Sequence, residues 1–294
     1  MTLSSATPGA APDALPAAPS ALGFDLLGLA RRAARAAGTE LLARADQPHR
    51  VSTKSTPTDL VSEADGVAES VIRETLLGAR PDDGFVGEEG SRDAGSTGIT
   101  WVVDPLDGTV NYLFGDREWS VSIAAVDAAG PLVGVVIEPV TGRLWTAVRG
   151  EGAWRDDVEI SARRTPALAD AMVLAGLSYD SAHRRRQMEM FTDVAPGVRD
   201  LRRHGSAALE LCRVAEGTAD AYVESPIFRW DIAAGALIAR EAGARVHVTD
   251  LDEVRRSVLA ATPVIFDELL ALLQASDFGT EFFNLAKVRT EGRG

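Results

Sequence analysis

Residues 101–115 read WVVDPLDGTVNYLFG, and this stretch decides how the 294-residue chain is interpreted. The apolar, β-branched run at residues 99–103 predicts a buried strand. We expect the strand to end at Asp104, because Pro105 has no backbone N–H with which to continue a ladder. Asp107 follows three residues later. The strand end therefore delivers two carboxylates that can converge on one hard divalent cation.

The turn that follows Asp107 adds groups suited to an anionic ligand. The Leu106 carbonyl can join the two carboxylates around a cation, and Gly108 lets the backbone approach a ligand closely. If a helix begins at Gly108 and Thr109, its free N–H groups can receive a phosphate. The Thr109 hydroxyl can orient a water molecule. An Asp-rich turn that caps a helix has the same composition, so this segment alone leaves that alternative open.

Helices are expected before this segment and strands around and after it. Residues 24–45 carry Leu and Ala at helical spacing, and residues 60–77 form a second apolar helix that Ser62 or a neighbour can cap. A short strand is expected at residues 84–87, before a loop that carries carboxylates. Further strands are expected at 120–126, 132–138 and 144–148. Helices followed by strands form an α+β pattern.

From about residue 171 onward the pattern alternates, which predicts an α/β layer with helices covering a sheet. The expected helices are 182–194, 207–215, 233–242 and 266–274; the expected strands are 172–178, 219–223, 244–248 and 258–261. We divide the chain into a flexible tail (1–22), an N-terminal α+β metal-binding domain (23–158), a C-terminal α/β substrate domain (159–275) and a C-terminal tail that frays or docks loosely (276–294).

Composition excludes several classes of protein. Apolar residues make up 46% and charged residues 25% of the chain, which excludes a disordered chain, a coiled coil or a collagen-like fibre. The net charge is −13, and we expect no DNA partner because binding a duplex needs a basic face. The single cysteine excludes an intrachain disulfide and a cysteine metal cluster. Any metal should therefore be hard and held by oxygens.

Nothing in the sequence indicates export or a membrane partner. The first residues lack the basic region and the continuous apolar stretch of a secretory signal. No run of about 18 apolar residues occurs, so no membrane span is expected. We therefore expect a cytoplasmic protein.

Three further segments carry acidic groups. Glu88 and Glu89 are adjacent in VGEEG, Asp231 follows Trp230 before an Ala-rich helix, and residues 54–65 read KSTPTDLVSEAD. Each has an ordinary explanation when taken alone. The glutamates can be solvated surface residues, Asp231 can be a helix N-cap, and the third segment can be a capped helix start.

Taken together, KSTPTDLVSEAD, VGEEG, WVVDPLDGT and WDIAAG resemble the motifs of the inositol monophosphatase family, which are lithium-sensitive, magnesium-dependent phosphatases. The resemblance extends from about residue 24 to 274 and is strongest to actinobacterial members. It implies a layered α-β-α-β-α, sugar-phosphatase-like fold, a homodimer, and two or three Mg²⁺ ions. It also implies metal ligation by Glu88, Asp104, the Leu106 carbonyl, Asp107 and Asp231.

The same resemblance implies roles for the other residues. Glu88, Thr109 and Asp65 resemble the catalytic set, in which Asp65 pairs with the Thr109 hydroxyl to polarise the attacking water. Lys54 matches a lysine near the phosphate, and Ser178 is a further candidate for the substrate pocket. The residues that resemble the family's substrate contacts are Asp107, Gly108, Thr109, Gly205, Ser206, Ala207, Glu224 and Asp231. Ser206 replaces a frequent Thr, and the SPIFR spacer after Glu224 departs from the commoner glycine-containing one.

The implied reaction is hydrolysis of a small phosphorylated polyol, inositol 1-phosphate first, by metal-activated water without a covalent intermediate. Histidinol phosphate, fructose 1,6-bisphosphate and 3′-phosphoadenosine 5′-phosphate remain alternative substrates, because metal ligands recognise only the phosphate. An alternative of another class is a catalytically silent binding module. Cys212 is expected in the core, and His183 and His204 are expected at the surface or in local hydrogen bonds rather than at the metal.

Overall fold

The strand that carries DPLDGT lies inside a mixed eight-stranded sheet in the computed structural model, which describes residues 20–45, 47, 51–53 and 60–283. In this larger sheet, β5 (Thr100–Asp107) pairs with β3 (Gly84–Gly87) in parallel and with β6 (Ser120–Asp127) in antiparallel orientation. The remaining strands are all antiparallel to their neighbours: β4 (Arg92–Asp93), β7 (Gly130–Glu138), β8 (Arg143–Val148), β9 (Gly152–Arg155) and β10 (Val158–Glu159).

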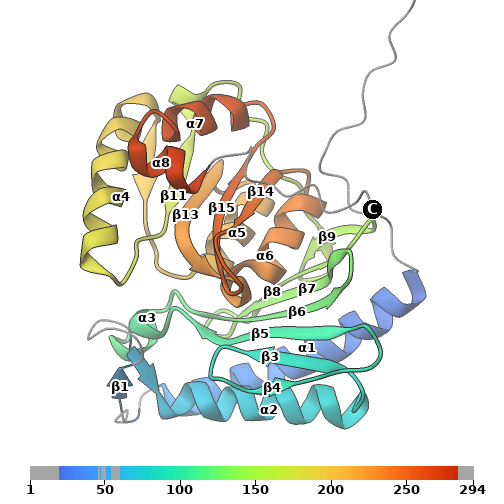
Figure 1. Cartoon of the computed structure of the whole chain (residues 1–294). Coiled ribbons are helices and arrows are strands. Elements are labelled where there is room, and N and C mark those ends of the chain that lie inside the picture. Colours follow the sequence, from blue (N-terminus) through green and yellow to red (C-terminus); the bar gives the residue numbers. More distant parts are fainter. Residues whose placement is uncertain (1–19, 46, 48–50, 54–59, 284–294) are drawn as a thin grey trace, which may run out of the picture.

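Two long helices, α1 (Ser20–Arg44) and α2 (Glu63–Ala79), cover one face of the larger sheet (Figure 1). The small and branched apolar residues of α1 recur at helical spacing, so they form one continuous stripe. Leu26, Ala30 and Leu41 on this stripe are fully buried. Ala side chains let the helix lie close to the strands, which supports a well-packed core on this face.

A second, five-stranded sheet forms the other half of the molecule, in the order β12-β11-β13-β15-β14. The β12–β11 and β11–β13 pairs are parallel, and the β13–β15 and β15–β14 pairs are antiparallel. Its strands are β11 (Met172–Ala175), β12 (Asp200–Arg202), β13 (Ala221–Phe228), β14 (Arg245–Asp250) and β15 (Arg255–Ala261).

Helices α5 (Ala207–Ala215) and α6 (Arg229–Glu241) lie between the two sheets and share one apolar core with both of them (Figure 1). The outer face of the smaller sheet packs against α4 (Ser181–Val194), α7 (Phe266–Leu273) and α8 (Asp277–Phe282). The layers therefore alternate helix, sheet, helix, sheet, helix. This arrangement confirms the expected α-β-α-β-α fold class.

Two local expectations are wrong, and two short strands were not expected. Residues 60–62 form strand β2 (Leu60–Ser62), paired with β1 (Val51–Thr53), so the second helix begins only at Glu63. Strand β5 does not end at Asp104; it continues to Asp107 with a shift of register between the two aspartates, which accommodates Pro105 without ending the strand. Strands β9 and β10, in residues 152–159, were not among the expected strands.

The C-terminal segment is better packed than expected. Residues 277–282 form α8, and Phe278, Phe282 and Phe283 are buried against the smaller sheet's outer helices. These aromatic side chains account for the ordered position, because each one removes a large apolar area from water. At the other end, α1 includes residues 20–22 of the predicted N-terminal tail. In the described part of the chain, no helix has both the length and the apolar composition needed to cross a membrane.

Candidate active site

Three carboxylates from distant segments meet beside the larger sheet. Glu88 follows β3, Asp104 lies within β5, and Asp231 lies in the first turn of α6. One oxygen from each lies within 4.8 Å of the others, and we call these three residues the acidic cluster. Sheet pairing places Glu88 beside the middle of β5, because the Glu88 N–H donates to the Val103 carbonyl at 3.1 Å. The fold thus brings together three of the predicted metal ligands.

Burial and mutual repulsion oppose the ionised form of this cluster. Burial raises the pKa of Asp104 well above its usual value, and the negative charges of Glu88, Asp107 and Asp231 raise it further. Burial likewise raises the pKa of Asp231. A bound cation would offset both effects. The donors are all carboxylate oxygens, with no thiol or imidazole among them, and this set fits a hard ion such as Mg²⁺.

Asp107 is placed differently from the acidic cluster. Its carboxylate accepts hydrogen bonds from the Ser206 hydroxyl at 2.6 Å, from Ala208 N–H at 2.7 Å and from Ala207 N–H at 3.2 Å. These groups form the N-terminus of α5, which favours a negative charge. Burial raises the pKa of Asp107 to about 6, while the bonds from Ser206 and the two amides oppose this rise. Asp107 therefore connects the larger sheet to the central helical layer.

The predicted catalytic pair forms a hydrogen-bonding unit next to the acidic cluster. The Thr109 hydroxyl lies 3.1 Å from Asp65 Oδ1 and 3.0 Å from the Leu106 carbonyl oxygen. Asp65 is fully buried, and Thr109 and Leu106 are nearly so. Asp65 reaches this position from the first turn of α2. Lys54 lies outside the described residues.

Gly108 makes the turn from β5 into the short helix α3 (Thr109–Leu113). Its φ of 93° is in the left-handed region, and a Cβ atom there would lie 2.9 Å from the Glu118 carbonyl oxygen. Both constraints require glycine. A helix does begin at Thr109, although it is only five residues long.

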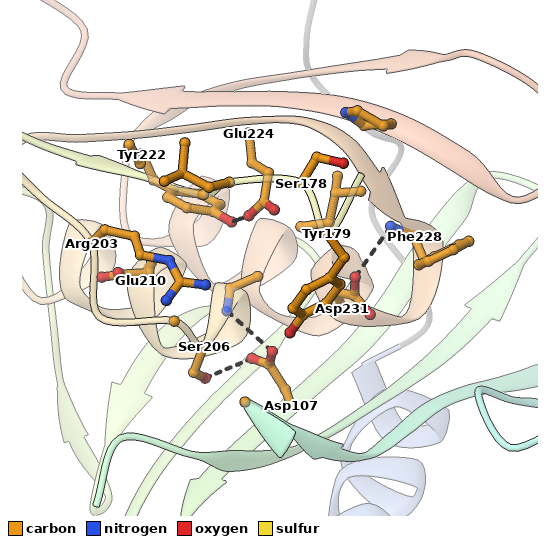
Figure 2. Close-up of a pocket in the computed structure, with 18 of the residues that line it drawn as sticks. Asp107, Ser178, Tyr179, Arg203, Ser206, Glu210, Tyr222, Glu224, Phe228 and Asp231 are labelled. Atoms are coloured by element: carbon orange, nitrogen blue, oxygen red, sulfur yellow. Dashed lines mark hydrogen bonds between the residues drawn. The ribbon is translucent and has the colours of Figure 1, made fainter. Parts of the chain in front are cut away.

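A cavity of about 350 Å³ opens beside these groups (Figure 2). Asp107, Gly108 and Asp231 line the end of the cavity that adjoins the acidic cluster. The other predicted substrate residues that line it are Ser178, Gly205, Ser206, Ala207 and Glu224. Asp231 belongs to both the cluster and the cavity wall, so the two form one continuous site.

Glu224 provides a half-buried acid at the far side of the cavity (Figure 2). The Tyr222 hydroxyl donates a hydrogen bond to its carboxylate. Burial raises the pKa of Glu224 to about 7, whereas Tyr222 and the positive charge of Arg203 oppose this rise. A Cβ atom on Gly176 would lie 1.6 Å from Glu224 Oε2, so the absence of a side chain there leaves room for the carboxylate.

The ordinary explanation of Asp231 as an N-cap is wrong. Phe228 is the N-cap residue of α6, and Asp231 lies in the first turn, where its carboxylate accepts a hydrogen bond from Phe228 N–H at 3.1 Å. Glu89 is not part of the acidic cluster. Its backbone N–H donates to Glu69 of α2 at 2.8 Å, and this bond helps to hold the loop that presents Glu88.

Several cavity residues were not identified from the sequence: Tyr179, Asp180, Arg203, Glu210, Tyr222, Phe228 and Arg255. Arg203 had a signal, because it immediately precedes the His-Gly-Ser turn into α5. Tyr179 had none, since a lone tyrosine after a strand is ordinary. His183 also lines the cavity, and His204 forms a local hydrogen bond with Glu210. Cys212 is fully buried in the core, as expected.

The layered fold and the acidic cluster beside a polar cavity together define a protein of the sugar-phosphatase type. A model of the inositol monophosphatase family matches residues 25–277. The chain belongs to the inositol monophosphatase family, and it is a phosphoric monoester hydrolase.

Similar proteins support this assignment. An inositol-1-monophosphatase from Mycobacterium leprae is 42% identical over 76% of this chain and 81% of its own length. A Nus factor SuhB from Xylella fastidiosa is 36% identical over 85% of this chain and 95% of its own. The crystal structure of the extragenic suppressor protein SuhB from Bartonella henselae is 32% identical, with a TM-score of 0.80 over 85% of this chain and 98% of that one.

Proposed function

We propose that the protein hydrolyses inositol 1-phosphate to inositol and phosphate, in a reaction that depends on Mg²⁺. The observation that carries the proposal is the continuity of the acidic cluster with a cavity that contains a second acid, Glu224. The cluster suits the phosphate end of a substrate, and Glu224 suits its hydroxyl groups. The name of the similar mycobacterial inositol-1-monophosphatase supports the same substrate.

Glu88, Asp104 and Asp231 would hold Mg²⁺, with the Leu106 carbonyl and Asp107 as further oxygen ligands. When bound, Mg²⁺ supplies charge neutralisation of the phosphoryl oxygens and acidification of water. The hydrogen bonds that Asp107 already accepts from α5 fix the orientation of its carboxylate. We infer that this orientation aligns the phosphate end of the substrate with the cavity.

The residues of the chain would act by orientation and proton handling. When Thr109 donates its hydroxyl proton to Asp65, its oxygen can accept a hydrogen bond from the attacking water. The backbone amides of Gly108 and Thr109 would bind phosphate oxygens at the turn into α3. Glu224 would accept hydrogen bonds from the polyol, beside Gly205, Ser206 and Ala207.

Water rather than a side chain would attack the phosphorus atom. Cys212, the single cysteine of the sequence, is fully buried in the core between the sheets, and burial raises the pKa of its thiol well above the usual value. A buried neutral thiol is a poor nucleophile. Hydrolysis would then proceed in one step at phosphorus, without a covalent enzyme intermediate.

A panel of phosphate esters tests the proposal. The purified chain is assayed for phosphate release from inositol 1-phosphate, histidinol phosphate, fructose 1,6-bisphosphate and 3′-phosphoadenosine 5′-phosphate, with Mg²⁺ and with EDTA. We expect the highest kcat/KM for inositol 1-phosphate and loss of turnover in EDTA. Equal or higher kcat/KM for histidinol phosphate would reject the proposed substrate.

The variant Asp104→Asn separates catalysis from binding. It keeps the size of the side chain but removes one negative charge from the acidic cluster, so we expect kcat to fall by at least about 100-fold, the scale on which a single stabilising group contributes to catalysis. The names of relatives called Nus factor SuhB favour a second candidate, a binding role. Equal inactivity of wild type and Asp104→Asn with every ester and metal would favour that binding role.

A further inference from the structure

A short segment between β11 and α4 forms one wall of the cavity. Leu177, Ser178, Tyr179 and Asp180 all line the cavity, and we call residues 177–180 the cavity loop. Asp180 ends the loop as the N-cap of α4 and accepts hydrogen bonds from Ala182 N–H and His183 N–H. The start of α4 therefore fixes one end of the loop.

Two side chains of helix α4 also hold the middle of the cavity loop. The Gln187 Oε1 atom accepts a hydrogen bond from Ser178 N–H at 2.8 Å, and the Arg184 guanidinium donates to the Ser178 carbonyl at 2.9 Å. Residues 184 and 187 lie on the same face of the helix, because they are three residues apart. The backbone of Ser178 is thus bound through both its donor and its acceptor.

Gln187 connects the cavity loop with the strand that carries Glu224. Its Nε2 atom donates to the Ser225 carbonyl at 2.7 Å, while its Oε1 atom accepts from the loop. The side chain is 1% exposed, so both bonds are shielded from water. Buried side-chain amides that satisfy both ends fix the spacing of the segments they join. Gln187 therefore fixes the distance between the cavity loop and the Glu224 strand.

Tyr179 extends from this fixed loop into the cavity. Figure 2 shows its ring pointing toward the end of the cavity that Asp107 and Asp231 line. Burial raises the pKa of its phenol, and the negative charges of Glu224, Asp107 and Asp231 act in the same direction. The phenol thus keeps its proton at neutral pH. A neutral hydrogen-bond donor therefore lies among three groups that, when ionised, can only accept hydrogen bonds.

We propose that Tyr179 is a specificity-determining residue whose hydroxyl donates a hydrogen bond to a hydroxyl oxygen of the polyol, and that Gln187 is the residue that positions it. This inference rests on the proposed function and deepens it. A polyol hydroxyl both donates and accepts, so a site with acceptors alone satisfies it only in part. Glu224 provides the acceptor and Tyr179 the matching donor, and both line the same cavity.

The variant Tyr179→Phe tests this role, because it removes the hydroxyl and keeps the ring. The full-length protein is assayed with Mg²⁺ on two esters: the polyol phosphate of the panel that wild type hydrolyses best, and 4-nitrophenyl phosphate, which has no hydroxyl group. We expect KM for the polyol phosphate to rise roughly fivefold to tenfold, the effect of losing one hydrogen bond. Its kcat, and kcat/KM for 4-nitrophenyl phosphate, should stay within about twofold of wild type.

Thr192→Val is the matched control, since it removes a hydroxyl from the exposed face of α4, the helix that holds the cavity loop. The Thr192 hydroxyl bonds only to a carbonyl of its own helix. This variant should leave KM for both esters unchanged. An equal loss with both esters in Tyr179→Phe would overturn the proposal, because it would indicate a general structural effect. Unchanged kinetics with the polyol phosphate would overturn it as well.

The variant Gln187→Met tests positioning, because methionine fills a similar volume without either hydrogen bond. We expect KM for the polyol phosphate to rise with little change in kcat. When Gln187→Met is added to Tyr179→Phe, the further rise in KM should be smaller than the rise that Gln187→Met causes in wild type. Fully additive effects on KM would reject the link between the two residues.

If wild type releases phosphate from 4-nitrophenyl phosphate but from no polyol phosphate, the proposed substrate class fails, and the role of Tyr179 fails with it. If Tyr179→Phe alone behaves like wild type, only this inference fails.

Discussion

Glu224 shows how burial and a hydrogen-bonded neighbour act in opposite directions on the pKa of one acid. Burial raises its pKa to about 7, and the Tyr222 hydroxyl bond acts against this rise. The ionised carboxylate accepts hydrogen bonds at both oxygens, whereas the protonated group uses one oxygen as a donor. The ionised form, which suits polyol hydroxyl donors better, is populated above the pKa. The affinity for a polyol phosphate should therefore increase as pH rises through about 7.

Tyr222→Phe should move this pH dependence upward. Without the hydroxyl bond the ionised form of Glu224 is less stable, so its pKa rises and the increase in kcat/KM for inositol 1-phosphate occurs at higher pH. We expect kcat/KM at pH 7 to fall roughly threefold to fivefold, with a smaller difference from wild type at pH 9. The pH profile with 4-nitrophenyl phosphate serves as the control, because that ester does not need Glu224. A profile that moves to lower pH would contradict this account.

At the scale of single residues, motifs were more informative than isolated side chains. Asp104 and Asp231 could be connected from the sequence because each belongs to a motif with characteristic neighbours. Tyr179 and Gln187 could not, since their importance comes from the distance between two backbone segments that only the folded chain brings together. The placement of Asp107 against α5 also depends on contacts between residues about 100 positions apart.

Helix α5 depends on Ser206 in two ways. The Ser206 hydroxyl is the N-cap acceptor for Leu209 N–H at 3.3 Å, and it donates to Asp107 at 2.6 Å. Ser206→Ala removes both bonds, so we expect the free energy of unfolding to fall by about 1 kcal/mol, and at most about 2. Urea denaturation followed by circular dichroism measures this change.

Ser276→Ala is the matched control, because Ser276 caps α8 without contacting a charged group. Its effect should be smaller than that of Ser206→Ala. A larger loss in Ser276→Ala would show that the bond to Asp107 adds nothing to the cap at α5.

The docking of α8 gives a second prediction at the scale of elements. Phe283 directly follows this helix and is 1% exposed, whereas Phe114 is 80% exposed. Phe283→Ala should lower the free energy of unfolding by about 3 kcal/mol, because it leaves a cavity in a packed core. Phe114→Ala should change it by less than about 0.5 kcal/mol. Equal, small changes in both variants would show that α8 contributes little to stability.

Elements with strong periodicity were predicted best from the sequence. The apolar stripe of α1 and the β-branched runs of β6, β7 and β8 each indicate one structure. Short elements were harder, because a three-residue strand such as β2 is determined by pairing with β1 rather than by its own composition. Pro105 shows the same limit: it breaks the ladder locally, yet the pairing of β5 with β6 resumes at Asp107.

For the molecule as a whole, the acidic cluster predicts a link between cation binding and stability. Burial and repulsion raise the pKa of Asp104 in the folded state, so its ionised form destabilises the metal-free fold. This destabilisation is absent at pH values below the pKa of Asp104 in the unfolded chain and complete above its pKa in the folded protein. Mg²⁺ that binds only the folded state should therefore stabilise it, by about 2.7 kcal/mol at one hundred times its Kd. Differential scanning fluorimetry with and without EDTA measures this gain.

Asp104→Asn should stabilise the metal-free protein and weaken its stabilisation by Mg²⁺. At neutral pH and in EDTA we expect the variant to have a higher Tm than wild type, because one buried negative charge is gone. Mg²⁺ should then raise the Tm of the variant by less than it raises that of wild type. Equal Mg²⁺ effects on the two proteins would contradict ion binding by the acidic cluster.

The order of layers could be expected only from the family resemblance. Alternation of strands and helices indicates that sheets are covered, but it does not say that α5 and α6 are shared by two sheets. That arrangement depends on apolar residues on several sides of α6, where Trp230, Leu237 and Ile238 are all buried. Helices that are apolar all round are typical of buried layers, and this feature of α6 was present in the sequence.

The shared helical layer has a consequence for how the chain can be divided. Arg163 and Arg164 are exposed in the connection between β10 and β11, so the backbone could be cut there without disturbing either sheet. Each fragment would then retain only one of the two surfaces that α6 requires, and its uncovered face would favour reassociation with the other. Because Asp104 and Asp231 would lie on different fragments, recovery of phosphatase activity from two separately expressed pieces would report directly on their assembly.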